Sequence, residues 1–356
     1  MLSMYTKKKY SIRDMILWTR WELVSFTLVA LTITALYEVG GLTWLRVPWT
    51  PIALIGTAVA FLIGFQNNAA YGRAWEARKI WGGIVNASRS WGLMVLAMVS
   101  NDEADPPVTA AELHRHHRRL IYRHLAWLTT LRYAMRESRP WEVFLENRTN
   151  REWSDRAGIP ERDTPLAVQL EPLLEQAEIE SVEAAANKPT AVLRLQMQDL
   201  SALKSAGLIW EFSFLELMSK LDELLELQGK SERIKNFPYP RQYATLGYDF
   251  VRVFVWLLPF GVIPEFAKVG LTLSEQFPVM GHYFVWLAVP FTVIVAWVFQ
   301  TMQRIGTVGE NPFEGSANDV PISTISRAIE IDMREQLQEQ PSSIPRPLVA
   351  VHGVQM

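Results

Sequence analysis

The chain has no cysteine among its 356 residues, and this absence excludes disulfides, thiolate metal sites and cysteine nucleophiles. It also lacks an excess of charge of either sign, because 35 Lys and Arg residues stand against 37 Asp and Glu residues. A formal net charge of -2, without a basic and aromatic RNA-binding motif, gives no general attraction to nucleic acid. Nucleic acid is therefore not an expected partner.

Signatures of catalysis are missing as well. There is no GxSxG, HExxH, GxGxxG or phosphate-cradling loop. His114 and His117 lie three apart, with His124 beyond, which is a spacing that metal ligands can use. Four arginines within the same ten residues would repel a cation, so the segment is interpreted as a solvated basic helix. We expect no enzyme, no catalytic residue, no metal site and no cofactor.

Charge is also absent from residues 47–72, which contain no Lys, Arg, Asp or Glu. At about 1.5 Å per residue this run exceeds a hydrocarbon layer of about 30 Å, so it predicts a membrane helix. The run continues without a break into a charged helical pattern. Thr57, Phe61 and Phe65 are spaced by four and share one face. They either pack against lipid or a neighbouring helix, or form stacked rings if several copies surround an axis.

Three further spans are of unequal quality. Residues 282–303 form a convincing span despite the interior Pro290, whereas residues 23–37 are apolar but short. Between Arg252 and Glu265 only twelve residues are uncharged, and hydropathy alone predicts a buried soluble helix there. Two of the four candidate spans are therefore strong and two are marginal.

Basic residues lie before the first span, after the second and after the fourth, while the short loops contain only Arg46 and Lys268. By the positive-inside rule both termini and the long middle region are cytoplasmic. The middle region is predicted to be largely helical. Residues 111–137 and 190–229 are expected helices, the second preceded by the capping residue Asn187.

Four motifs together resemble the bestrophin family in its bacterial branch. They are GFQNNAAYGRAWEARKIW at residues 64–81, ENPF at 310–313, NDVP at 318–321 and IEID at 329–332. The resemblance extends from the first span to about residue 335. It implies an all-α membrane protein, a homopentameric ion channel with four membrane helices per subunit around a central pore and a large helical cytosolic region. It also implies that the two marginal spans cross the membrane, shielded by neighbouring subunits.

The expected organisation of the chain has five parts. These are a cytosolic N-terminal segment (1–22), the first two membrane helices with the pore neck (23–65), a cytosolic helical region (66–248), the last two membrane helices (249–303) and a cytosolic tail (304–356). The expected location is the inner membrane of a bacterium.

The resemblance implies a narrow hydrophobic neck at Thr57, Phe61 and Phe65. Thr57 departs from the usual apolar residue at the first neck position, so the barrier is expected to depend mainly on the two phenylalanines. A cytosolic aperture is implied at Phe212, for which the alternative is an ordinary helix core beside Trp210.

Below the neck, the resemblance implies a vestibule at Gln66, Arg73 and Glu76. The signs of Arg73 and Glu76 oppose each other, and Glu76 is also interpreted as part of an ion-paired helix surface.

The tail-docking loop is expected at Asn311, Asn318 and Asp319. Animal bestrophins carry a dense run of aspartates after the Asn-Pro-Phe motif that binds calcium. Here Ser316 stands where a carboxylate would be expected and only Asp319 remains. We expect a channel that does not require calcium, in which the loop residues act as turn and capping residues.

The expected partners are four further copies of the chain, membrane lipid and small inorganic ions. The expected function is conduction of anions such as chloride through the neck. Two alternatives stay open: a monovalent cation channel of the same architecture, conducting sodium or potassium, and a non-conducting membrane scaffold.

Overall fold

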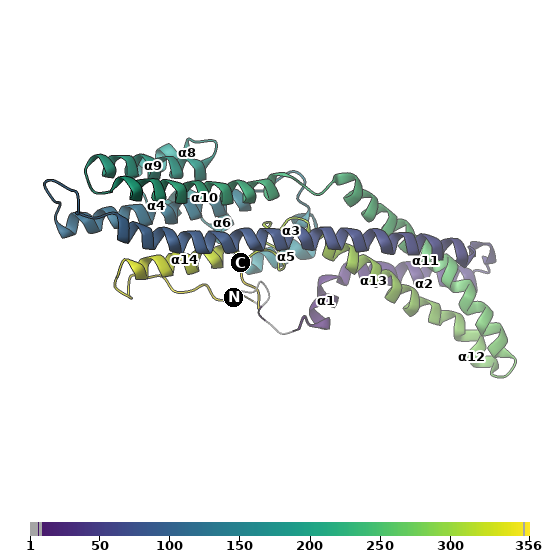
Figure 1. Ribbon diagram of the computed structural model, residues 1–356. Helices are drawn as coiled ribbons and strands as arrows, with labels where there is room; N and C mark the ends of the chain where they lie inside the picture. Colours follow the sequence, from purple (N-terminus) through teal and green to yellow (C-terminus); the bar gives the residue numbers. More distant parts are fainter. Residues whose placement is uncertain (1–5, 7–8, 352) are drawn as a thin grey trace.

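The computed structural model describes residues 6, 9–351 and 353–356. Over this part of the chain the protein is helical, and the only extended pairings are two isolated bridges, Val99 with Ile209 and Val351 with Val354. The all-α prediction is confirmed. The molecule is elongated, with long helices extending toward one end and a bundle of helices at the other (Figure 1).

One helix joins the two ends. The helix α3 (Trp49–Met98) has 50 residues and spans roughly 75 Å. The helix begins after Pro48, because proline disfavours a helical conformation in the residue that precedes it. Figure 1 shows α3 running through both halves of the molecule. The sequence prediction of an unbroken helix that leaves the apolar region is confirmed.

The apolar half packs against the first part of α3. It contains α2 (Arg20–Glu38), α11 (Arg241–Ser274), α12 (Pro278–Tyr283), the short 3₁₀ helix η3 (Phe284–Leu287) and α13 (Ala288–Gly309), while η1 (Thr43–Leu45) connects α2 to α3. Within the described residues, four helical segments are long and apolar enough to cross a membrane. These segments comprise α2, α3 with its η1 lead-in, α11, and α12 to α13.

The helix α11 contains the weakest of the marginal spans. It is 34 residues long, and the Glu265 and Lys268 side chains pair at 2.7 Å toward its C-terminal end. The expectation of four long apolar helices is confirmed, and the interpretation of residues 252–265 as a soluble helix is wrong. Gly56 lets α11 approach α3 closely, because a Cβ at this position would lie 2.7 Å from the Phe254 ring.

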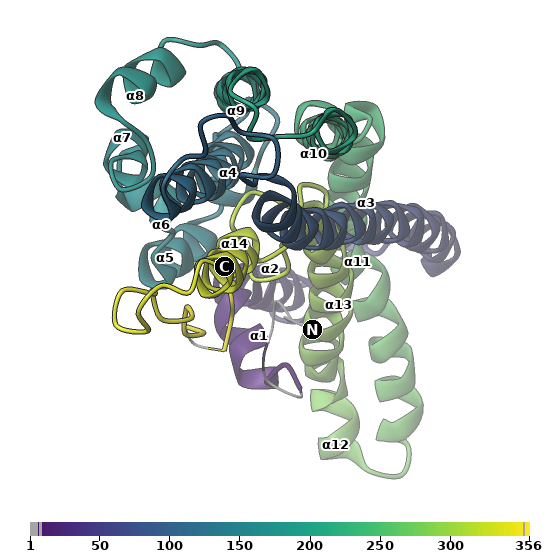
Figure 2. The ribbon, with the colours of Figure 1, turned by 60° about the vertical axis from the view of Figure 1, so that its left-hand side comes forward.

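The polar half packs around the second part of α3. Its long helices are α4 (Ala110–Arg136), α9 (Lys188–Ser205), α10 (Glu211–Asn236) and α14 (Ile322–Gln336), and its short ones are η2 (Phe144–Glu146), α5 (Arg148–Ala157), α6 (Pro160–Asp163), α7 (Leu166–Leu170) and α8 (Gln176–Glu183). Figure 2 shows α10 on one side of α3 and α14 on the other. Trp81, Trp91 and Trp127 are fully buried at the centre of this bundle.

The helix predicted at 111–137 is confirmed, but the single helix predicted at 190–229 is wrong. The chain turns at Gly207, whose φ of +73° suits glycine, and α10 begins only at Glu211. The predicted cap is confirmed, since the Asn187 side chain accepts a hydrogen bond from the Thr190 backbone N–H at 3.0 Å.

The two described ends of the chain lie together. The Thr6 backbone N–H donates to the Gly353 carbonyl at 2.8 Å, close to α14 and to the short helix α1 (Ile12–Trp18). Four long apolar helical segments lie between these two chain ends in the described part of the chain, and an even number of them returns the chain to the side on which it started.

Candidate pore-lining site

Phe61 and Phe65 lie on the outer face of α3. They are 66% and 69% exposed, whereas Val59 and Ile63, on the opposite face, are buried against α11. Thr57 is exposed on the same outer face, and its hydroxyl donates to the Ala53 carbonyl at 3.0 Å. The three predicted neck side chains therefore share one stripe that the protomer itself leaves uncovered.

Phe212 lies in the first turn of α10 and is 62% exposed. Its ring contacts Trp210, with 4.7 Å between the ring centroids. The bridge between Val99 and Ile209 places this turn beside the far end of α3, roughly 50 Å along the helix axis from Phe65. The interpretation of Phe212 as an ordinary core residue of its own protomer is wrong.

Gln66, expected in the vestibule, is instead buried, with 3% of its surface exposed. Its amide donates to the Glu310 carboxylate at 2.8 Å and to the Thr307 hydroxyl at 3.3 Å. Gln66 directly follows Phe65, and the rotation of about 100° between successive helical residues points the Gln66 side chain into the interior. Gln66 thus joins α3 to the end of α13, and its side chain does not reach the surface of the Phe61 stripe.

Arg73 and Glu76, the other two residues expected in the vestibule, make different kinds of contact. The Arg73 guanidinium donates to three backbone carbonyls, those of Glu310 at 2.7 Å and of Ile234 and Phe237 at 2.9 Å each. It therefore caps the C-terminal end of α10, whose last carbonyls lack helical partners. Glu76 forms an exposed ion pair at 2.8 Å, with Arg233 of α10. The ion-paired surface predicted for Glu76 is present, although its partner comes from another helix.

The loop after α13 closes on itself. The Asn311 amide donates to Glu314 at 3.2 Å, and the Asp319 carboxylate accepts from the Gly315 backbone N–H at 2.6 Å and from the Ser316 hydroxyl. The Asn318 side chain is exposed, and only its backbone N–H contacts Ser316, at 3.3 Å.

Arg136 of α4 ties this loop to the polar bundle. Its guanidinium donates to the Phe313 carbonyl at 2.9 Å and lies 3.6 Å from the Asp319 carboxylate. Burial raises the pKa of Asp319 and lowers that of Arg136, while each charge opposes the shift of the other. The contacts of Asp319 thus go to its own loop and to an arginine.

Glu314 lies beside the ion pair of Lys235 and Glu142. Burial, followed by repulsion from Glu142 and Asp319, raises the pKa of Glu314 to about 9. The carboxyl group is consequently protonated at neutral pH, and one of its oxygens, Oε2, is buried without a hydrogen-bond partner in the protein.

The first turns of α4 are the solvated basic helix that the sequence suggested, since His114, Arg115 and Arg118 are exposed, but the helix beyond them is not. Residues 120–131 of α4 are all buried, and the His124 ring lies between Trp91 and Trp127 with Nε2 at 2.9 Å from the Ser88 hydroxyl. Burial lowers the pKa of His124 to about 3, so the ring is neutral. In the part of the chain that the structure describes, no group of three potential ligand side chains could hold a metal ion.

Carboxylates of other helices neutralise the arginines in the buried part of α4. Arg123 pairs with Glu178 and, at 2.7 Å, with Asp199, and Arg132 pairs with Glu161. Their partners lie 29 to 76 residues away in sequence, so helical spacing alone could not reveal them.

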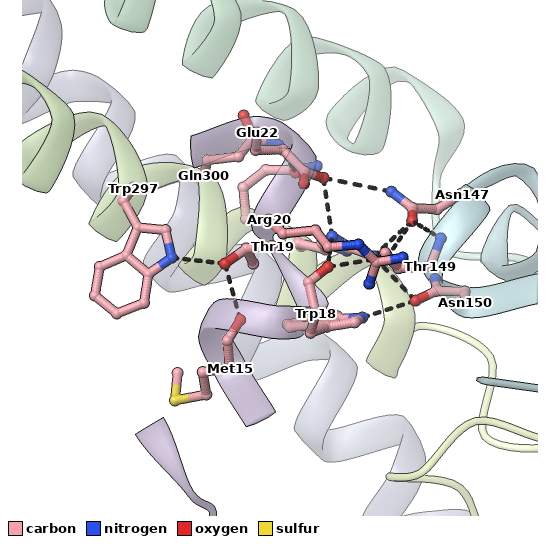
Figure 3. Close-up of polar contacts among 12 residues, drawn as sticks. Met15, Trp18, Thr19, Arg20, Glu22, Asn147, Thr149, Asn150, Trp297 and Gln300 are labelled. Atoms are coloured by element: carbon pink, nitrogen blue, oxygen red, sulfur yellow. Dashed lines mark hydrogen bonds and ion pairs between the residues drawn. The ribbon is translucent and has the colours of Figure 1, made fainter. Parts of the chain in front are cut away.

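A second cluster that sequence reasoning missed surrounds Arg304 at the end of α13. Its guanidinium donates to the Trp18 carbonyl and to Glu22, both at 2.8 Å, and stacks over the Trp18 ring at 4.2 Å. It also donates to side chains at the start of α5, namely Asn147, Thr149 and Asn150. Figure 3 shows these partners converging from the α1–α2 elbow and from α5. Arg304 thus joins the N-terminal elbow, a polar-half helix and an apolar helix.

Comparison with known proteins agrees with this architecture. The profile of a family described as Bacterial/Fungal Bestrophin protein matches residues 8–335. The voltage-dependent anion channel-forming protein YneE of Salmonella typhi is 25% identical over 313 residues, covering 87% of this chain and 84% of that protein. A voltage-dependent anion channel-forming protein of Ralstonia nicotianae is 28% identical over 290 residues, covering 82% and 78%.

Among solved structures, a bestrophin homologue from Klebsiella pneumoniae has a TM-score of 0.67 at 21% identity, covering 90% of this chain and 99% of that one. The two proteins share a fold over nearly their whole lengths.

Proposed function

Because the chain belongs to the bacterial and fungal bestrophin family, whose named relatives form channels and are not enzymes, we propose that it forms a homopentameric anion channel. Five copies would surround an axis lined by the first half of α3, with the neck at Thr57, Phe61 and Phe65 and the cytosolic aperture at Phe212. The relatives named as anion channel-forming proteins support anions, chloride among them, as the conducted ions.

The observation that carries the proposal is the exposed aromatic stripe on α3. Two phenylalanines that are 66% and 69% exposed, spaced by one helical turn, contribute little to the folding of the protomer. Around a five-fold axis they would form two stacked rings of apolar side chains. Such a constriction resists ions by excluding water, since an ion that loses its hydration shell there gains nothing in return.

Membrane insertion and orientation belong to the same proposal. The four apolar segments would span the inner membrane of a bacterium, with lipid covering their outer faces. The lysines and arginines at residues 7–20 and 73–79 favour a cytoplasmic location for both termini and for the polar half. The polar half would then extend the pore into the cytosol, with Arg73 and Glu76 just below the neck.

A double substitution, Phe61→Ala with Phe65→Ala, tests the neck. Removing both rings should widen and wet the constriction, so the conductance of the purified channel in planar bilayers should rise several-fold while the assembly persists. Phe291→Ala on α13 is a matched control, because Phe291 is also exposed, at 54%, but lies on another helix.

The result that would contradict the neck is a double variant that has lost stability instead. If the two rings were packing residues, their removal would leave cavities and cost about 3–5 kcal/mol each. Unchanged conductance in a fully assembled double variant would equally place the barrier elsewhere. Absence of current through both the wild-type protein and the double variant would favour the non-conducting scaffold.

A further inference from the structure

The exposed stripe of α3 that carries the neck residues continues into the polar half. Lys79 follows Phe61 by 18 residues, which is five turns at about 3.6 residues per turn, so both side chains leave the helix in the same direction. Lys79 is exposed and lies roughly 21 Å along the helix axis from Phe65. The face of α3 that presents the two phenylalanine rings therefore also presents an ammonium group, on the polar side of the neck.

The other basic side chains of α3 are engaged or point elsewhere. The Arg73 guanidinium donates to backbone carbonyls at the end of α10 and after α13. Arg89 pairs with Asp332 of α14 at 2.6 Å. Arg78 lies about 100° around the helix from Lys79. Among the basic residues of α3, all of which the structure describes, Lys79 is the one on the line of the neck stripe.

The helix α10, which packs along α3 (Figure 2), brings balanced charges to the level of Lys79. Arg233 pairs with Glu76 at 2.8 Å, about one turn from Lys79 along α3. Lys230, one turn earlier on α10, pairs with Glu226 at 2.7 Å. Because Lys79 forms no ion pair within the described residues, this level of the polar half carries a surplus of positive charge.

Two exposed carboxylates of α10 form no ion pair, but they lie nearer its start. Asp222 and Glu216 precede Lys230 by 8 and 14 residues, which is roughly 12 and 21 Å along the helix. The Debye length is about 8 Å at physiological ionic strength, so salt largely screens both carboxylates at the level of Lys79. The positive charge of Lys79 is therefore the dominant one there.

We propose that Lys79 is a selectivity-determining residue of the channel, which attracts small inorganic anions to the cytosolic mouth of the neck. This role rests on the proposed pentamer, in which five ammonium groups surround the axis beyond Phe65. The phenylalanine rings carry no charge, so the preference for one sign of ion comes from charges beside the neck. A ring of lysines raises the local concentration of anions and lowers that of cations.

Planar-bilayer recordings of the purified full-length protein test this role in wild type, Lys79→Gln and Lys79→Glu. At about 0.1 M KCl, Lys79→Gln should lower the anion conductance about twofold. In a KCl gradient its reversal potential should move away from the chloride equilibrium potential, and that of Lys79→Glu should move further. At about 1 M KCl the Debye length is about 3 Å, so the difference in conductance between Lys79→Gln and wild type should largely disappear.

Two control variants separate charge from shape. Lys79→Arg keeps the positive charge and should behave as the wild type. Arg115→Gln removes an exposed arginine of α4 that lies off the stripe, beside Glu112, and should leave both conductance and reversal potential unchanged. Lys79 is exposed, so all three of its variants should assemble as the wild type does.

The results that would overturn the role of Lys79 differ from those that would overturn the channel. An anion-selective wild type whose conductance and reversal potential are unchanged in Lys79→Gln would leave the channel in place and exclude Lys79. The same fractional loss of conductance at both salt concentrations, shared by Lys79→Arg, would exclude an electrostatic role. A wild type that reverses at the potassium equilibrium potential, or that carries no current, would contradict both proposals.

Discussion

Single side chains in this protein carry structural roles that their charge alone does not reveal. From the sequence, Arg304 is only a positive residue that follows an apolar run. In the structure its side chain is 6% exposed, and its guanidinium donates hydrogen bonds to five acceptors. Phe61 shows the opposite, because a large apolar side chain is left exposed where the sequence offered packing as one option. Burial, which requires the tertiary fold, distinguishes these cases.

Removing the Arg304 charge should be costly. Arg304→Gln removes the cationic partner of the Glu22 carboxylate, which is left with a hydrogen bond of 3.4 Å from the Asn147 amide, so we expect a loss of about 3–5 kcal/mol in unfolding free energy, measured by denaturation in detergent. Arg20→Gln is the matched control, because the Arg20–Glu152 pair is partly exposed and such pairs contribute about 0–1 kcal/mol. Equal losses in the two variants would show that the Arg304 cluster adds nothing beyond surface charge.

Glu314 should make stability depend on pH. Its folded pKa of about 9 exceeds its unfolded value of about 4.3, so the folded state holds a proton that the unfolded state releases between these limits. This contribution to stability is fully present below pH 4.3 and is lost as the pH rises toward 9. Glu314→Gln should therefore melt a few degrees above the wild type at pH 8, with the gain vanishing toward pH 4.3.

The exposed Glu146→Gln serves as the comparison for that experiment. A melting difference between Glu314→Gln and wild type that stays constant with pH would exclude the raised pKa as its cause.

At the level of helices, the sequence predicted α3 and the extent of α4, but not how α4 is buried. The uncharged run and the pattern that follows it define α3 through one-dimensional periodicity, which a single helix preserves. For α4, the density of arginines indicated solvent, which holds for Arg115 and Arg118, whereas the structure buries the rest of the helix by pairing Arg123 and Arg132 with distant carboxylates. Tertiary ion pairs are invisible to helical spacing. The buried position of Gln66 was missed for the same reason, since its partner Glu310 is 244 residues away.

The close packing of α3 on α11 gives a prediction about stability. Gly56→Ala would place a methyl group 2.7 Å from the Phe254 ring, so it should lower the unfolding free energy by about 1–3 kcal/mol. Gly82→Ala on the same helix meets no atom within 4 Å and should be neutral or stabilising by up to about 1 kcal/mol. If the two variants had the same stability, the α3–α11 contact would not be close in the assembled protein.

The loop after α13 gives a prediction about calcium. The Asp319 carboxylate already contacts Gly315, Ser316 and Arg136, and the raised pKa of Glu314 keeps the Glu314 carboxyl group neutral. Current through the purified channel in planar bilayers should therefore be the same with calcium and with a chelator. A large, saturable rise in current on adding calcium would contradict this prediction.

At the scale of the whole molecule, one copy of the chain leaves many large apolar side chains exposed. Exposed aromatic side chains follow one side of α3, the start of α10 and the first turns of α11, and they include Phe61, Phe65, Phe212, Tyr243 and Phe250. Large exposed apolar surfaces are typical of contacts with a membrane or with another protein chain. The resemblance in the sequence predicted the family and the four long apolar helices, whereas the geometry of the proposed pore would depend on neighbouring copies of the chain.

The central proposal is an anion-conducting pore, and the reversal potential of the purified protein in planar bilayers across a KCl gradient tests it most directly. We predict a reversal potential close to the chloride equilibrium potential. A value close to the potassium equilibrium potential would contradict anion conduction and establish the cation channel of the same fold.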